Sequence, residues 1–134
     1  MQEFFTREKA NEGIQVPLWR PDGTKSEHWI RIRGIDSDIF READAMARRE
    51  AVGIASVEDP AERSRQIAAL KRRLSVSLVV DWSFPEECTK EAVEKFFIEA
   101  PQIMDAIDTA SGKRALFFAS ESSSSQPSPS TVSS

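Results

Sequence analysis

The amino-acid sequence predicts a mainly α-helical fold in which an N-terminal β-hairpin is followed by about four packed helices. Three observations support this prediction. Apolar side chains alternate on both sides of a Pro-Asp-Gly turn, they recur every three or four residues after residue 34, and residues 120–134 are rich in serine. We therefore expect a single helical domain over residues 1–119 and a disordered tail over residues 120–134.

The hairpin is predicted at about residues 14–34. Every second residue from Ile14 to Leu18 is apolar, and Ile30 and Ile32 alternate with arginines in the second run. The segment Pro21–Gly23 between the two runs supplies the residues that a turn needs, because proline presets φ and glycine accepts a positive φ. A short helical turn between residues 6 and 13 is expected to precede the hairpin.

Three capping signals mark the expected helix starts. Asp36 or Ser37 is suited to cap a helix that ends near Gly53. Asp59 is expected to cap a second helix, with proline at its first position. Thr89 is expected to cap a third helix that ends near residue 100. Pro101 begins the fourth helix, which either ends at residue 112 or continues through residues 116 and 117.

The second helix is predicted to be the longest and to continue as far as residue 82. The helical stripe that supports this consists of Ile67, Leu70, Leu74, Leu78 and Trp82. A buried β-strand is the alternative for the last part of this segment, because its valines favour sheet. We interpret the segment as helix because the stripe is not interrupted.

Four aromatic residues surround a proline turn at residue 85. They are Trp82, Phe84, Phe96 and Phe97. Aromatic side chains at helical spacing on both sides of a short turn are typical of two packed helices, and a ligand pocket is the alternative. We interpret these residues as a buried aromatic corner of the core.

The composition gives little support for an enzyme. The chain has one histidine, His28, and one cysteine, Cys88, at distant positions, and its five glycines are scattered singly. Nucleophilic catalysis, a zinc site and a phosphate-binding loop each need residues that this inventory lacks. We therefore expect no catalytic residues, no cofactor and no metal, and the single cysteine fits a reducing compartment.

The charge pattern disfavours nucleic acid and membrane partners. The formal net charge is -4, and no apolar run approaches the ~20 residues of a membrane span. Arg48 and Arg49 form a basic pair, but acidic residues surround it. We interpret the pair as a solvated face or an ion-paired interface with another subunit, and nucleic-acid binding remains the less favoured alternative.

A protein–protein interaction is therefore the expected function. A two-stranded hairpin leaves backbone edges that another chain can extend. Apolar side chains on the hairpin and the basic pair make up the candidate surface for self-association or client binding. Its residues are Trp19, Trp29, Ile30, Ile32, Arg48 and Arg49.

The order of these elements resembles the tail assembly chaperones of long-tailed bacteriophages, in particular those of lambdoid phages with flexible tails. The resemblance rests on FFTREKANEGIQVPLWRPDGTKSEHWIRIRG, DSDIFREADA and LVVDWSFPEECTKEAVEKFFIEAPQIMDAI. Its most specific parts are the Trp-Ser-Phe segment at residues 82–84 and the APQIMDAI segment at residues 100–107. It covers nearly all of residues 1–119 and includes no catalytic signature.

This resemblance implies a small protein of the infected bacterial cytoplasm that is absent from the mature virion. Such chaperones are thought to multimerise around the tape measure protein and to bring tail tube protein to it. They are commonly made together with a longer, frameshifted form. The resemblance thus implies an open, spiral-like homo-oligomer, a non-enzymatic role and no cofactor. The alternative function is a small phage nucleic-acid-binding regulatory protein.

Overall fold

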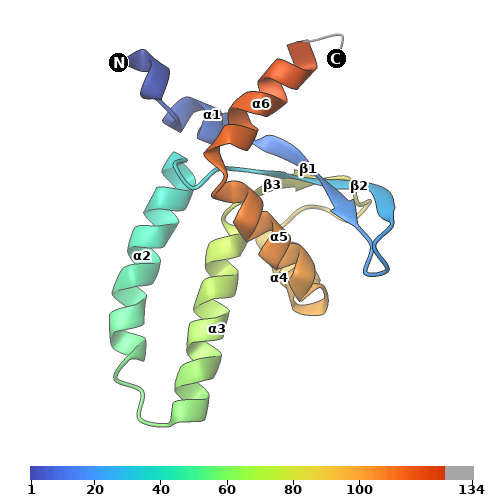
Figure 1. The fold of residues 1–134 in the computed structure, drawn as a ribbon. Coiled ribbons are helices and arrows are strands. Elements are labelled where there is room, and N and C mark those ends of the chain that lie inside the picture. The colour runs from blue at the N-terminus through green and yellow to red at the C-terminus, as the bar shows by residue number, and fades with distance from the viewer. Residues whose placement is uncertain (126–134) are drawn as a thin grey trace.

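The computed structural model describes the backbone of residues 1–125 and the side chains of residues 1–119 (Figure 1). In chain order the elements are a 3-10 turn (Gln2–Phe4), α1 (Arg7–Glu12), β1 (Ile14–Trp19), β2 (Lys25–Ile32), α2 (Asp38–Ile54), α3 (Pro60–Val76), β3 (Val79–Trp82), α4 (Lys90–Glu99), α5 (Pro101–Ser111) and α6 (Arg114–Ser125). The prediction of a mostly helical protein with an N-terminal hairpin is confirmed, and a third strand is added to it.

The three strands form one antiparallel sheet in the order β1-β2-β3. Ile14 lies opposite Ile32 and Val16 lies opposite Ile30, which is the register expected from the alternating pattern. On its other side β2 pairs with β3, where Ile30 lies opposite Trp82. The hairpin is therefore not a lone pair of strands, because β2 is hydrogen-bonded on both sides.

The helical interpretation of residues 79–82 is wrong, and the strand alternative holds. α3 ends at Val76, and Arg33 ties the following turn to the sheet, since its guanidinium donates to the carbonyls of Ser77 and Val79 at 3.0 and 3.1 Å. Residues four apart share a face in a strand as well as in a helix, so the spacing of Leu78 and Trp82 does not separate the two. Pairing with the free edge of β2 favours the strand.

α2 and α3 form an antiparallel pair that projects away from the sheet (Figure 1). We call this pair the arm, residues 38–76. The predicted caps are confirmed, because the side chain of Ser37 accepts from the amide of Phe40 and that of Asp59 accepts from the amide of Glu62. Most of the arm lies beyond the core, and Ile54 is the only residue of α2 that is buried.

The core lies where the sheet meets the C-terminal helices. α5 and α6 contact β1, while α4 packs against α3 and α5. The largest fully buried side chains include Ile30, Ile32, Leu78, Phe97 and Ile107. Thr89 caps α4 as predicted, through a hydrogen bond from the amide of Ala92. Isoleucines from the sheet and aromatic residues from the helices thus form a single core cluster.

The C-terminal boundary differs from the sequence-based expectation. α5 ends at Ser111, and after a short turn a separate helix, α6, continues to Ser125. The backbone of residues 120–125, the first part of the predicted tail, therefore belongs to α6. The remaining residues of that tail, 126–134, lie outside the described part of the chain. Within the described part, none of the helices has both the length and the apolarity that crossing a membrane requires.

Candidate interaction surfaces

The sheet residues of the predicted surface do not lie together. Ile30 and Ile32 are 0% exposed, so their assignment to an interaction surface is wrong. They are buried because β2 is the central strand and these side chains point into the core. Trp29 is half-buried, whereas Trp19, at the end of β1, is 54% exposed. Of the four, Trp19 is the one that presents a large apolar side chain to solvent.

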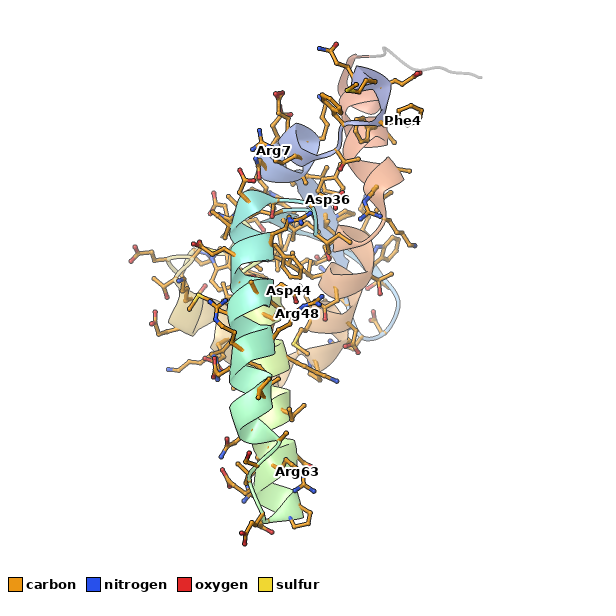
Figure 2. The ribbon with its side chains drawn as sticks, turned by 90° about the vertical axis from the view of Figure 1, so that its left-hand side faces the viewer. Phe4, Arg7, Asp36, Asp44, Arg48 and Arg63 are labelled. Atoms are coloured by element: carbon orange, nitrogen blue, oxygen red, sulfur yellow. The ribbon has the colours of Figure 1, made fainter. Side chains whose placement is uncertain are left out.

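The basic pair lies on the arm. Arg48 Nε contacts the Asp44 carboxylate at 3.0 Å, one helical turn away, and Figure 2 shows both side chains on α2. Arg49 is exposed. The hairpin turn next to Trp19 and helix α2 lie on opposite sides of the molecule in Figure 1. The structure therefore divides the predicted surface into two separate regions.

The aromatic corner is packed as predicted. The Trp82 ring lies 5.2 Å from that of Phe84 and 6.0 Å from that of Phe96, both edge to face, and Phe84 and Phe96 are 5.1 Å apart. Trp82 Nε1 also donates to the carbonyl of Glu86 at 2.7 Å. Such centroid distances are typical of packed aromatic pairs, so these side chains contact one another directly. The corner joins β3 to α4 rather than one helix to another.

A hydroxyl–imidazole pair that sequence reasoning missed lies beside this corner. His28 Nδ1 is 3.0 Å from the Ser83 hydroxyl, and the His28 ring packs on Phe84 at 4.6 Å. The same hydroxyl accepts from the amide of Trp29 at 2.9 Å. Among the described residues no carboxylate bonds to the His28 ring to orient it, as a catalytic pair would require. The contact instead fastens β2 to the residue that follows β3.

The cysteine and the potential metal ligands are the other groups that could take part in chemistry. Cys88 is partly buried, and this burial, together with the Asp81 charge, raises the pKa of its thiol above the ordinary value. A raised pKa leaves less of the nucleophilic thiolate. In the described part of the chain, no three potential metal ligands gather at one point.

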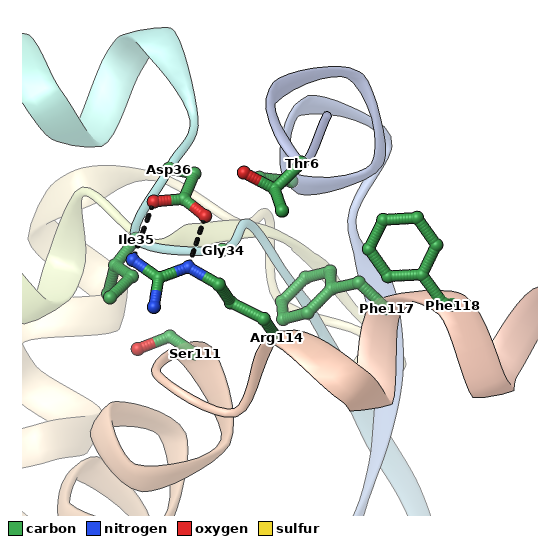
Figure 3. Close-up of a pocket in the computed structure, with 9 residues that line it drawn as sticks. Thr6, Gly34, Ile35, Asp36, Ser111, Arg114, Phe117 and Phe118 are labelled. Carbon is green, nitrogen blue, oxygen red and sulfur yellow. Dashed lines mark hydrogen bonds and ion pairs between the residues drawn. The ribbon is translucent and has the colours of Figure 1, made fainter. Parts of the chain in front are cut away.

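A small niche lies between α1, the loop after β2, and the start of α6 (Figure 3). It offers only about 10 Å³ to the centre of a water molecule, which is room for one water at most. Arg114 closes it, because its Nε and Nη2 donate to the two carboxylate oxygens of Asp36 at 2.5 and 2.9 Å. We call the Asp36–Arg114 ion pair the clamp, because it joins two segments that are 78 residues apart in sequence.

The clamp makes stability depend on pH. The hydrogen bond from Arg114 holds the pKa of Asp36 below its ordinary value of 3.8, with smaller contributions from Thr6 and Arg41. A carboxyl whose pKa is lower in the folded state stabilises the fold above its unfolded pKa, and this stabilisation is lost as the pH falls through the folded pKa. We expect Asp36→Asn to be less stable than the wild type at pH 7, and the difference to shrink below pH 3.8.

Denaturant melts at a series of pH values test this expectation. Glu8→Gln, at an exposed carboxylate on α1, is the matched control and should show no comparable pH-dependent difference. A loss of stability in Asp36→Asn that is the same at every pH would show that the ion pair does not clamp α6 to the loop.

The arm carries a larger groove between α2 and α3. Its volume is about 430 Å³, and its lining comprises four apolar residues, which we call the floor (Ala51, Ala55, Ile67 and Ala68), together with Arg63, Ser64 and Lys71. Figure 2 shows Arg63 at the far end of the arm. The alanine spacing in the sequence is the signal that could have indicated this groove, because small side chains let two helices approach while leaving their seam shallow.

Exposed apolar side chains mark two further regions. On α2, Ile39, Met46 and Val52 are at least half exposed, Val52 reaches 73%, and none of the three lines the groove. At the chain start, Phe4 and Phe5 are exposed, and Phe5 lines a shallow pocket together with Phe118 of α6. Large apolar side chains on a protein surface indicate interaction sites when they gather in one place.

Comparisons of this chain with protein-family models, with curated proteins and with solved structures found no match.

Proposed function

We propose that this chain is a tail assembly chaperone of a long-tailed bacteriophage, which multimerises and coats the tape measure protein during tail assembly. The observation that carries the proposal is the projecting arm, whose helix α2 holds Ile39, Met46 and Val52 in solvent. A helix in a stable monomer ordinarily buries its apolar side chains. The arm therefore has the character of a binding element, and the sequence resemblance indicates the partner.

The physical mechanism follows from the form of the client. A tape measure protein is long and helical, so its apolar surface is distributed along its length rather than concentrated at one site. Many copies that each contribute a modest apolar contact cover such a surface better than one deep pocket. The exposed side chains of α2 lie on more than one face of the helix, so each copy provides modest contacts, since each buried side chain contributes about 1.5–3 kcal/mol at most.

Because each contact is weak, the chaperone can be released from the client. Tail tube protein, which the chaperone is proposed to recruit, displaces it as the tube polymerises around the client. This function needs no nucleotide, cofactor or metal. The proposed setting is the host bacterial cytoplasm, with the chaperone absent from the mature virion and accompanied by a longer, frameshifted form.

Co-expression with a tape measure protein tests the proposal. We expect the wild-type chain to keep a larger fraction of the client in the soluble fraction than an empty vector does. Met46→Asp combined with Val52→Asp should abolish this effect, because a charge at each position prevents apolar contact. Val80→Asp, which alters an exposed valine of β3 outside the arm, is the control and should retain the effect.

Two outcomes would contradict the proposal. One is a client that stays as insoluble with the wild-type chain as without it. The other is equal protection by the wild type and by the double variant, with circular dichroism showing both to be folded, because the arm would then have no part in client binding.

A nucleic-acid-binding regulator is the second candidate, and the charge of α3 favours it. This helix contains five basic residues and one acidic residue. Phosphate contacts make retention on nucleic acid fall steeply as salt rises. Strong, salt-dependent retention of the purified chain on DNA or RNA would favour this candidate over the chaperone.

A further inference from the structure

Charge is distributed unevenly between the arm and the rest of the molecule. α3 carries five basic residues against one acidic residue, although the whole chain has a net charge of -4. Between residues 81 and 111, which include α4 and α5, eight residues are acidic and two are basic. One copy of the chain therefore has a basic helix on its arm and, at its core end, two helices, α4 and α5, that together carry five acidic and two basic residues.

The groove of the arm combines an apolar floor with uncompensated positive charge. Lys71 is exposed and has no acidic partner among the described residues. The guanidinium of Arg63 donates to the carbonyl of Val57 at 2.7 Å, and no acidic side chain of residues 1–119 forms an ion pair with it. The opposite seam of the arm differs, because an ion pair between Arg73 and Glu50 at 2.5 Å crosses it. The groove side is thus the one that attracts an acidic partner.

The region of α4 and α5 around Ile98, called the Ile98 face below, has an arrangement that complements the groove. Ile98 on α4 is 53% exposed, although its neighbour Phe97 is buried. Glu99 follows it directly, and the exposed Asp105 lies on the adjoining helix α5. Neither carboxylate has a basic partner in the described part of the chain. Lys95, one helical turn before Ile98, is the exposed basic residue of this region, so the face presents one apolar side chain with two carboxylates against one lysine.

We propose that the Ile98 face of one copy docks into the arm groove of a second copy of this chain. The apolar side chain covers the alanines of the floor, while Glu99 and Asp105 face Lys71 and Arg63. Opposite charges placed in this way orient the encounter and exclude other pairings. The inference rests on the proposed function, because it supplies the self-association surface that a coat requires.

The two surfaces differ, so the contact is heterologous. The groove lies on the projecting arm and Ile98 lies on a helix at the core, which leaves one free groove and one free face after each addition. Heterologous contacts build rings when the rotation closes and open helical arrays when it does not. The exposed side chains Met46 and Val52 lie on α2 outside the groove, so they remain free for a client in such an array.

A charge-reversal experiment with the full chain tests the docking. The arm variant combines Ala68→Glu with Lys71→Glu, and the face variant combines Glu99→Lys with Asp105→Lys; all four positions are exposed. Self-association is measured by analytical ultracentrifugation over a concentration series. Each variant alone should associate at least about tenfold more weakly than the wild type, because like charges then meet at the contact.

Mixing the two variants provides the decisive result. The reversed arm of one variant complements the reversed face of the other, and the two unreversed surfaces complement each other as in the wild type. An equimolar mixture should therefore regain wild-type association. Matched controls make the same change of net charge at exposed positions elsewhere, with Lys25→Glu and Ala115→Glu for the arm variant and Glu8→Lys and Glu27→Lys for the face variant. They should associate as the wild type does.

Three results would overturn the inference. They are a wild type that stays monomeric at every concentration, variants that associate as strongly as the wild type, and a mixture that does not recover. Loss of nucleic-acid retention in the arm variant, without loss of association, would also overturn it. The groove would then be a binding site for nucleic-acid phosphates. Client protection in co-expression is measured separately, so the docking can fail while the proposed function stands.

Discussion

Replacing Phe97 with alanine is expected to lower the free energy of unfolding by about 3–5 kcal/mol. The Phe97 ring is 1% exposed and belongs to the core cluster that joins the sheet to the helices. Its removal takes away the transfer free energy of the ring and leaves a cavity that close-packed neighbours fill only in part. Chemical denaturation followed by circular dichroism measures the change.

The adjacent residue supplies a matched control. Ile98 lies on the same helix but is 53% exposed, so Ile98→Ala should change the free energy of unfolding by less than about 1 kcal/mol. An equal cost for the two variants would contradict the orientation of α4. A small cost for Phe97→Ala would show that the aromatic residues of α4 line an open groove rather than the core.

Replacing Gly13 with alanine is expected to destabilise the protein by about 1–3 kcal/mol from backbone strain alone. Gly13 joins α1 to β1 with φ +80° and ψ 176°, a conformation that residues with a Cβ rarely adopt. A Cβ at this position would also lie 2.4 Å from the carbonyl oxygen of Ile32. Strain and collision act together, so the total cost should exceed that of strain.

Gly23 separates these two effects. It also has a positive φ, +92°, but a Cβ there would meet no atom within 4 Å. Gly23→Ala should therefore show only the strain, and Gly13→Ala should be the more destabilised of the two. Melts that rank the two variants in the reverse order would contradict the packing of the α1–β1 junction against β2.

The sequence predicts those features that depend on short-range chemistry. The side chains of Ser37, Asp59 and Thr89 each accept a hydrogen bond from a backbone amide at the start of a helix, as their positions before helical patterns indicated. The hairpin register follows from alternation, because a slip of one residue would move the buried side chains to the solvent face. These features could be predicted since each depends on residues that are close in sequence.

Features that depend on distant partners were not predictable in the same way. Residues 79–82 form a strand because β2 offers them a pairing edge, and their own spacing fits helix and strand equally. Burial of Ile30 and Ile32 follows from that third strand and from the helices over the sheet, neither of which a hairpin pattern reveals. The groove likewise requires two helices to be placed side by side before its alanines form one floor.

The proposed coat consists of many copies of this chain on one long helical client. The mass of the complex with tape measure segments of two lengths, measured by light scattering coupled to size-exclusion chromatography, tests it most directly. A repeating coat predicts that doubling the length of the segment about doubles the number of copies of this chain bound, because the contacts repeat along the client. A fixed number of copies on both segments, or no complex with either, would contradict it.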